Sequence, residues 1–268
     1  SEGLKLTNNT GPKSQLSSSE VLTIIFFYQL SGMKNFQYYY QRLVQPILVS
    51  YFPNLVSYSR FVELVGEHAP LMWMFTQSQT LRSEKTGRYF IDSKRLPVCH
   101  NRRIKQNKVF QGIAQRGKSS TGWFYGLKIH LVINDLGQIV HFLLTSGSTA
   151  DNQEKVLHHL LDDLKGDCYG DKGYISKLFE QFYQNGLKLV TKVRKNMKQL
   201  LYNFSDAIFL RKRGMIESVN DILMTVCDIE HTRHRSANNA FTHIFASLAA
   251  YNFLNSKPTL ESQYFIAK

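Results

Sequence analysis

The chain has 268 residues, of which 43% are hydrophobic and 13% aromatic, so it can bury a core and is not broadly disordered. No apolar run approaches the roughly 18 residues that a membrane span needs. A net charge of +13 favours a polyanionic partner such as nucleic acid over an ordinary basic protein. The three cysteines form no CxxC pair, which argues against a disulfide framework or a zinc ribbon and suits a reducing, cytoplasmic setting.

The N-terminal region predicts a polar segment followed by a helix. Residues 1–16 are mostly polar, and we expect them to be flexible. Ser17 and Glu20 then have the S-x-x-E spacing of a capping box ahead of an apolar run. The predicted helix ends near Gly32.

Two further helices are predicted before residue 80. They cover 35–51 and 57–75 and are separated by Pro53, which cannot continue a helix. Three short helices with tight turns over 17–80 fit a helix-turn-helix DNA-binding domain. A plain three-helix bundle fits the same periodicity, so both arrangements stay open.

From about Leu81 onward, short strands alternate with helices. Strands are predicted over 88–92, 123–134, 138–145, 167–171 and 187–193. Helices are predicted over 151–164 (capped by Asp151 or Asn152), 174–185, 213–226 and 237–254. Asn134 to Gly137 form a hairpin turn between the second and third strands. This order predicts an α/β fold, a mixed sheet with helices on its faces.

Three carboxylates are notable because each lies in a basic stretch. Asp92 ends the first predicted strand, and nine Lys or Arg residues but no acid separate it from Asp135. Asp171 ends another predicted strand and precedes a lysine. Glu217 lies one turn into a helix that opens with the basic run 211–213.

Carboxylates in basic surroundings suit chemistry on phosphodiesters. Two divalent ions about 3.5–4 Å apart can activate the nucleophile, stabilise the leaving oxygen and neutralise the phosphate. Hard ions such as Mg²⁺ take oxygen ligands, and carboxylates at strand ends and on a facing helix can converge at one sheet edge. Nearby Lys and Arg would hold the DNA backbone. For any single Asp the alternative is a turn or helix cap.

Five short motifs follow one another along the chain. They are YFIDS (89–93), GLKIH (126–130), LTSGSTAD (144–151), GDKGY (170–174) and RGMIE (213–217). In this order they resemble the DDE transposases of bacterial insertion sequences, and most of all the insertion sequence 982 group. The resemblance extends from about Leu16 to Asn255.

The resemblance implies a fold, an activity and a metal. The fold would be a ribonuclease H-like catalytic domain over 81–256, after the small all-helical domain (17–80) and before a tail (257–268). Asp92, Asp171 and Glu217 would bind Mg²⁺, with Mn²⁺ as a substitute. The enzyme would cleave and transfer DNA strands at insertion-sequence ends, as a homodimer on double-stranded DNA in the bacterial nucleoid.

Several basic residues are predicted to contact DNA. The resemblance implies that Arg213 binds a phosphate, although an ion pair with Glu217 one helical turn away is an alternative that can coexist with it. The other predicted DNA contacts are Lys128, Lys172, Arg102, Arg103, Lys105, Arg233 and Arg235. The basic loop 231–235 either faces DNA or is a solvated surface. The aromatic run 123–125 either stacks on a base or packs in the core.

Two positions depart from the wider transposase pattern, which has a Tyr three residues before the Arg and a Lys seven after the Glu. Leu210 and Met224 stand there instead, so phosphate contacts from these positions are not expected. The chain begins at Ser1, from which we expect a missing N-terminal piece. The alternative functions are a metal-dependent nuclease of the same fold and an inactive DNA-binding remnant of a transposase.

Overall fold

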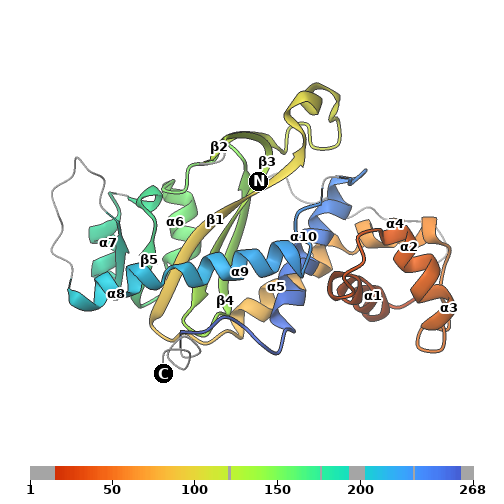
Figure 1. The fold of residues 1–268 in the computed structure, drawn as a ribbon, viewed down its shortest axis with the longest axis horizontal. Helices are drawn as coiled ribbons and strands as arrows, with labels where there is room; N and C mark the ends of the chain where they lie inside the picture. The colour runs from red at the N-terminus through yellow and green to blue at the C-terminus, as the bar shows by residue number, and fades with distance from the viewer. Residues whose placement is uncertain (1–15, 120–121, 176, 193–202, 232, 261–268) are drawn as a thin grey trace.

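The computed structural model describes residues 16–119, 122–175, 177–192, 203–231 and 233–260. A six-stranded mixed sheet lies among helices, and the N-terminal helices α1 to α4 gather at one end of the molecule (Figure 1). Most of the segment expected to be flexible and most of the predicted tail lie outside the described residues.

The first predicted helix is confirmed together with its cap. α1 spans Ser18–Leu30. The Ser17 N–H donates to Glu20 Oε2 at 2.8 Å, and the Glu20 N–H donates back to Ser17 Oγ at 3.3 Å. These two bonds satisfy amides that the first turn of a helix leaves without intrahelical partners.

The second predicted helix is interrupted by a wider turn. Its range forms α2 (Phe36–Tyr39), the π-helical turn η1 (Tyr40–Val44) and α3 (Gln45–Ile47). Pro46 has no amide hydrogen, and its ring crowds the carbonyl one turn earlier. The π-turn that precedes it accommodates this crowding.

The third predicted helix is two helices, so the prediction of only three was wrong. α4 spans Tyr58–Glu67 and α5 spans Ala69–Leu81, with His68 between them. Pro70 has no amide hydrogen with which to continue the hydrogen bonds of α4, and it is well tolerated in a first helical turn. The chain therefore ends one helix and begins another here.

The N-terminal helices share their core with the C-terminal helix α10 (Ala237–Asn252). α10 packs against α1, α4 and α5, and its Ala246 lies fully buried in their hydrophobic cluster. Thr242 Oγ1 also donates to the Val65 carbonyl oxygen at 2.9 Å. The helical unit thus includes residues far from 17–80, and a domain boundary at residue 80 stays a prediction.

The described sheet has both parallel and antiparallel pairs. Its strands are β1 (Arg88–Cys99), β2 (Gln115–Ser119), β3 (Gly122–Asn134), β4 (Ile139–Ser146), β5 (Gly166–Gly170) and β6 (Leu187–Thr191). β3 pairs antiparallel with β1, β2 and β4, whereas β5 pairs parallel with β1 and β6. A curled mixed sheet flanked by helices is consistent with a ribonuclease H-like fold.

The predicted hairpin turn between β3 and β4 is confirmed. The Gly137 N–H donates to the Asn134 carbonyl oxygen at 3.1 Å, and Gly137 has a φ of 73°. A side chain at Gly137 would be strained by this backbone conformation and would also meet the Pro258 carbonyl oxygen.

The first strand is longer than predicted, so Asp92 lies inside it and not at its end. β1 continues to Cys99 because its second half stays paired with β3, with Asp92 opposite Leu131. Its pairing with β5 stops earlier, at Phe90 opposite Tyr169. Asp92 therefore lies where β1 extends past β5.

Helices cover both faces of the sheet. α6 (Glu154–Leu161) and α7 (Phe179–Gln184) pack on the face that carries Ile91, whereas α8 (Phe204–Lys212), α9 (Gly214–Thr225) and α10 pack on the face that carries Phe90. Figure 1 shows α9 running across the sheet. Alternate strand residues point to opposite faces, so Asp92 faces α9 and Ser93 faces the α6 side.

Some local predictions were wrong. β2 and α8 were not predicted, and the helix expected over 174–185 is reduced to η3 (Lys172–Tyr174) and the short α7. α6 begins at Glu154 with Gln153 as its N-cap residue, so neither Asp151 nor Asn152 caps it. Asp151 has other partners, described below.

Candidate active site

Asp92 is held between two side chains of the α8–α9 segment. Its Oδ1 lies 3.7 Å from Arg213 Nη1, and its Oδ2 accepts a hydrogen bond from Asn220 Nδ2 at 3.2 Å. The Asp92 side chain is 23% exposed. A half-buried carboxylate on a central strand is therefore accessible from the α9 side of the sheet.

Asp171 directly follows β5, the strand that pairs parallel with β1. The last paired residues are Phe90 and Tyr169, and Asp92 and Asp171 each follow two residues later. Past this point β1 continues alongside β3, whereas the chain after β5 turns into η3. Asp171 is half-buried and begins the η3 turn.

Arg213 connects Asp92 to Glu217. It lies between α8 and α9, and its Nη2 donates to Glu217 Oε1 at 3.0 Å. This confirms the predicted ion pair one helical turn apart. Arg213 is 14% exposed and Glu217 is 59% exposed, so the guanidinium is mostly buried while the Glu217 carboxylate reaches solvent.

Asn220 is a site residue that the sequence analysis missed. Its side chain is 3% exposed, and it donates the hydrogen bond to Asp92 described above. Asn220 follows Glu217 by three residues and Arg213 by seven, which is the spacing of one helix face. That spacing was the available signal.

The pKa of Asp92 is raised from 3.8 to about 6. Burial is the largest cause, and the negative charges of Glu217 and Asp151 add to it, whereas Arg213 lowers the pKa. The loss of hydration is therefore the main reason for the raised pKa, and the Arg213 guanidinium offsets it only in part.

The donor set fits a divalent metal ion, although the side chains are not gathered around one point. Within the described ranges, no three Asp, Glu, His or Cys side chains form a ready metal site. Arg213 takes the place of a cation between Asp92 and Glu217. Carboxylate oxygens are nonetheless the ligands that Mg²⁺ or Mn²⁺ prefers.

The two positions that depart from the wider pattern have packing roles. Leu210 is 7% exposed in the main core, and Met224 packs against the same core. Both side chains fill space between the helices and the sheet. This agrees with the expectation that neither contacts a phosphate.

A family profile described as the transposase DDE domain matches residues 82–237, which is more than half of the chain. The chain belongs to the DDE transposase family. The matched region contains every described strand and α9, and thus all three carboxylates. Membership implies a nuclease or transposase enzyme of a mobile element with DNA as its substrate, and such enzymes generally use divalent metal ions.

Two further findings concern curated proteins and membrane-spanning helices. No curated protein matches the transposase. Among the described helices, none combines the length and the apolar character needed to cross a membrane.

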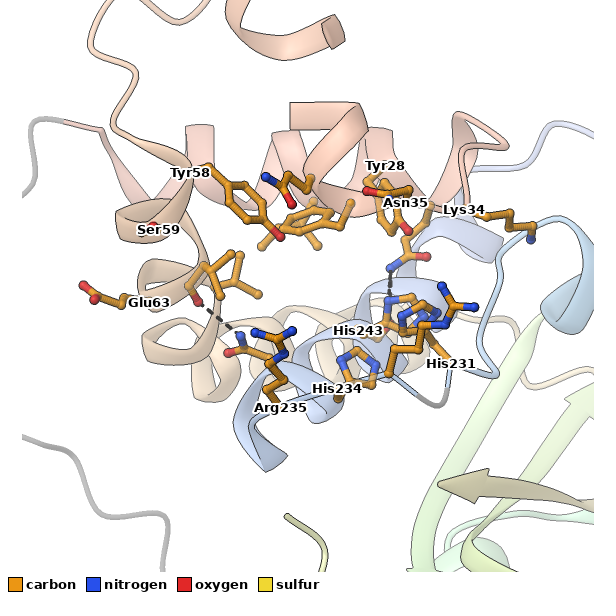
Figure 2. Close-up of a pocket in the computed structure, with 18 residues that line it drawn as sticks. Tyr28, Lys34, Asn35, Tyr58, Ser59, Glu63, His231, His234, Arg235 and His243 are labelled. Atoms are coloured by element: carbon orange, nitrogen blue, oxygen red, sulfur yellow. Dashed lines mark hydrogen bonds between the residues drawn. The ribbon is translucent and has the colours of Figure 1, made fainter. Parts of the chain in front are cut away.

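The predicted DNA-contacting residues lie in separate places. Lys172 is exposed beside Asp171, and Arg102, Arg103 and Lys105 are exposed on η2 (Asn101–Gln106). Arg233 and Arg235 are also exposed but line a cavity between the N-terminal helices and the segment before α10 (Figure 2). The carboxylates do not line that cavity.

The aromatic run on β3 divides between the core and the surface. Phe124 is 3% exposed, as core packing predicts, whereas Trp123 is 56% exposed. Arg116 and Lys118 lie 5.9 and 5.8 Å from the Trp123 ring centroid. An exposed indole beside two cations suits a base or ribose next to DNA phosphates.

We predict that Trp123→Ala weakens DNA binding about 10-fold, since loss of one stacked base costs about 1–3 kcal/mol. Fluorescence anisotropy with labelled duplex measures the affinity. Tyr183→Ala is the matched control, because Tyr183 is 68% exposed on α7, away from this strand. Equal weakening by both variants would contradict a specific contact at Trp123.

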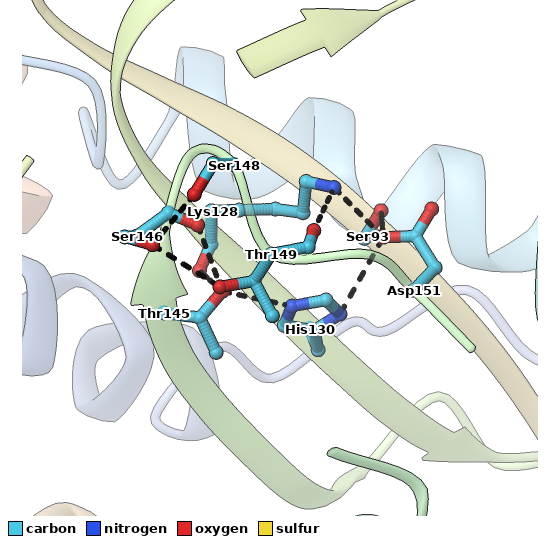
Figure 3. Close-up of polar contacts among 8 residues, drawn as sticks. All are labelled: Ser93, Lys128, His130, Thr145, Ser146, Ser148, Thr149 and Asp151. Atoms are coloured by element: carbon cyan, nitrogen blue, oxygen red, sulfur yellow. Dashed lines mark hydrogen bonds and ion pairs between the residues drawn. The ribbon is translucent and has the colours of Figure 1, made fainter. Parts of the chain in front are cut away.

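A partly buried polar network lies on the face of the sheet that carries Ser93, opposite the face that carries Asp92. Figure 3 shows its side chains. Asp151 Oδ1 accepts hydrogen bonds from Ser93 Oγ at 2.9 Å and from Lys128 Nζ at 3.0 Å. His130 Nδ1 lies 3.8 Å from the same oxygen. Burial lowers the pKa of His130 to about 4, so the ring is neutral at pH 7.

The network also reaches the turn after β5. A Cβ added at Gly173 would lie 3.4 Å from Asp151 Oδ2, and Asn152 Nδ2 donates to the Ile175 carbonyl oxygen at 3.0 Å. Asp151 therefore touches the residue after Asp92 and lies against the turn that begins with Asp171. Its place suggests that it positions both carboxylates.

Lys128 belongs to this network. Its side chain is 12% exposed, and Nζ also donates to the Thr149 carbonyl oxygen at 2.8 Å. Two partners occupy the ammonium group in this structure. The predicted DNA contact of Lys128 stays a prediction that would require it to exchange partners.

Proposed function

We propose that the transposase cleaves DNA at the ends of an insertion sequence and transfers the cut strand to a target. Asp92, Asp171 and Glu217 would hold the divalent metal ions, Mg²⁺ with Mn²⁺ as a substitute. The observation that supports this proposal most is the parallel pairing of β1 with β5, in which Phe90 lies opposite Tyr169, two residues before Asp92 and Asp171 respectively. Burial raises the pKa of Asp92 to about 6, so a bound cation would stabilise the ionised form of this carboxylate.

When bound, the metal ions would activate the attacking oxygen and neutralise charge on the phosphate. The chain's own side chains prepare the site. Asn220 fixes one oxygen of Asp92, leaving the other toward Arg213. Arg213 keeps Asp92 and Glu217 from repelling each other while the site lacks a cation. Glu217 is exposed and can leave Arg213 at little cost.

Arg213 is also placed to bind a DNA phosphate. Its Nε is buried and has no hydrogen-bond partner among the described residues. A guanidinium released from Glu217 offers several donors in one plane, a geometry that suits phosphate oxygens. The ion pair and the phosphate contact would then alternate in time.

Besides the catalytic carboxylates, we propose that η2, Lys172 and the helical unit (α1 to α5 together with α10) contact DNA. The helical unit would bind the terminal repeats. Two DNA ends must be paired for transposition, so a homodimer is expected. Membership of the insertion sequence 982 group is part of the same proposal. These contacts would be salt-dependent because they neutralise phosphates.

The test uses labelled DNA that carries the ends of the element, with Mg²⁺ and a target plasmid. We predict that Glu217→Gln and Asp171→Asn each reduce cleavage and strand transfer at least about 10²-fold while DNA binding persists. Asp221→Asn is the control, because Asp221 is exposed on the same helix. Full activity of either variant would refute the assignment.

The products of the same assay separate the alternatives. Strand-joined products identify a transposase. Cleavage without joining identifies a nuclease of the same fold. DNA binding with no metal-dependent cleavage identifies an inactive remnant.

A further inference from the structure

A cavity of about 610 Å³ lies between the N-terminal helices and the segment that leads into α10. Figure 2 shows its two walls, with Tyr28 and Tyr58 on one side and His231, His234 and Arg235 on the other. Cavities of roughly 300–1,000 Å³ accommodate small organic groups. The three carboxylates do not line it, so it is distinct from the candidate active site.

The wall formed by the N-terminal helices is aromatic. Phe36 lies between Tyr28 and Tyr58, with ring centroids 4.8 and 6.3 Å away respectively. Tyr28 is buried, whereas Phe36 and Tyr58 are half-exposed at the cavity. Half-exposed aromatic rings form a platform on which a nucleobase can stack.

The opposite wall is cationic. Arg233 and Arg235 are exposed and line the cavity. Burial raises the pKa of Tyr58, and the positive charge of Arg235 opposes that shift, which places the guanidinium near the aromatic wall. Lys34 also lines the cavity, but Asp228 neutralises it at 2.5 Å. Glu63, a carboxylate in the lining, is paired with Arg60 at 2.8 Å. The two arginines therefore carry the charge available to an anionic ligand.

The cavity contains an acceptor without a donor. Gln29 is 2% exposed, and its Nε2 donates to His243 Nδ1 at 3.1 Å. His243 Nε2 donates in turn to the Asp228 carbonyl oxygen at 2.6 Å, which fixes the tautomer. Gln29 Oε1 then has no partner among the described residues. A buried acceptor without a donor is costly, so turning the Gln29 amide toward the cavity would be favoured where a ligand N–H is present to bind Oε1.

Three histidines line the cavity (His231, His234 and His243), but they do not form a metal site. Their ring centroids lie 4.9 to 5.4 Å apart, but His243 uses both ring nitrogens in the hydrogen bonds above. The remaining pair, His231 and His234, is too few for a closed site. An organic ligand suits the cavity better than a cation.

We propose that this cavity binds one unpaired nucleotide of the DNA substrate. The base would stack on Phe36 and Tyr58 and donate an N–H to Gln29, and its phosphate would lie against Arg233 and Arg235. Residues 226–231 and 233–236 lie between the end of α9, the helix that carries Glu217, and the start of α10, and several of them line the cavity. The inference rests on the proposed function in requiring a DNA substrate, but it does not require cleavage or joining.

The test compares three DNA probes: a paired duplex, the same duplex with one unpaired 3′ adenosine nucleotide, and one whose extra nucleotide lacks the base. The full chain should bind the second about 10-fold more tightly than the other two, since a stacked base contributes about 1–3 kcal/mol. Equal affinity for all three probes would overturn the proposal. Equal affinity for the two extended probes would overturn the base contact.

Four variants test whether the preference for the unpaired nucleotide comes from this cavity. Ser59→Trp should remove it by filling the cavity from an exposed position, without disturbing the core. Arg235→Gln should weaken binding of the extended probes, whereas Lys155→Gln, which removes an exposed positive charge on α6 outside the cavity, should not. Glu217→Gln should keep the preference, so loss of catalysis and loss of nucleotide binding are distinguishable. An unchanged preference in Ser59→Trp would overturn the assignment to this cavity.

Discussion

Asp92→Asn is expected to make the metal-free transposase more stable while abolishing its activity. Burial and two neighbouring carboxylates raise the pKa of Asp92 to about 6, so its ionised form is disfavoured in the folded state at neutral pH. One pKa unit corresponds to about 1.4 kcal/mol, so a neutral isostere should add about 1–3 kcal/mol at pH 7. For a chain of this size the melting temperature should rise by about 3–10 °C.

The size of this stability difference between the variant and the wild type depends on pH. Below pH 4, Asp92 is protonated in both the folded and the unfolded state, and the variant should gain nothing. Between pH 4 and 6 the folded state binds more protons than the unfolded state, so wild-type stability falls relative to the variant as pH rises. Above pH 6 the difference is constant. Thermal denaturation at pH 4, 5, 6 and 7 measures it, with Asp221→Asn as the control.

Mg²⁺ should make the wild type more stable than Asp92→Asn, which reverses the order expected without metal. A metal ion that binds only the folded wild type stabilises it by an amount that grows with the ratio of ion concentration to Kd. Asp92→Asn lacks a charged ligand and should gain much less. A variant that is less stable than wild type at pH 7 without metal, or equally stabilised by Mg²⁺, would contradict the assignment of Asp92.

The local parts of this fold were predictable because short-range signals determine them. The capping box at Ser17 and the turn ending at Gly137 depend on a few neighbouring residues, and both were correct. The extent of β1 was not predictable in this way. Its second half is a strand because β3 pairs with it from more than 25 residues away along the chain.

In the candidate site, too, local sequence signals predicted some residues, whereas contacts between distant parts of the chain determined others. Carboxylates in basic stretches identified Asp92, Asp171 and Glu217 as candidates, and the structure tests only their placement. Asn220 was missed because a buried Asn on a helix is not informative until its partner strand is known. Asp151 was assigned a local capping role, whereas its actual partners Ser93 and Lys128 are 58 and 23 residues away in the sequence.

Asp151→Ala should be among the most destabilising substitutions in the catalytic region. It would leave the Lys128 ammonium, which is 12% exposed, without its carboxylate. Breaking a buried ion pair costs about 3–5 kcal/mol, and because Asp151 is 26% exposed we expect about 2–3 kcal/mol. The melting temperature should fall by about 5–10 °C. Asp163→Ala is the control, because its ion pair with Lys85 is half-exposed.

A second substitution separates the role of the charge from that of position. Adding Lys128→Met to Asp151→Ala removes the unpaired cation, so the double variant should regain at least about half of the lost stability. Activity should not return with it. Ser93 would still lack the acceptor that holds it next to Asp92, and the turn beginning at Asp171 would lack its contact with Asp151. If strand cleavage recovers in proportion to stability, Asp151 serves the fold alone and does not position the catalytic carboxylates.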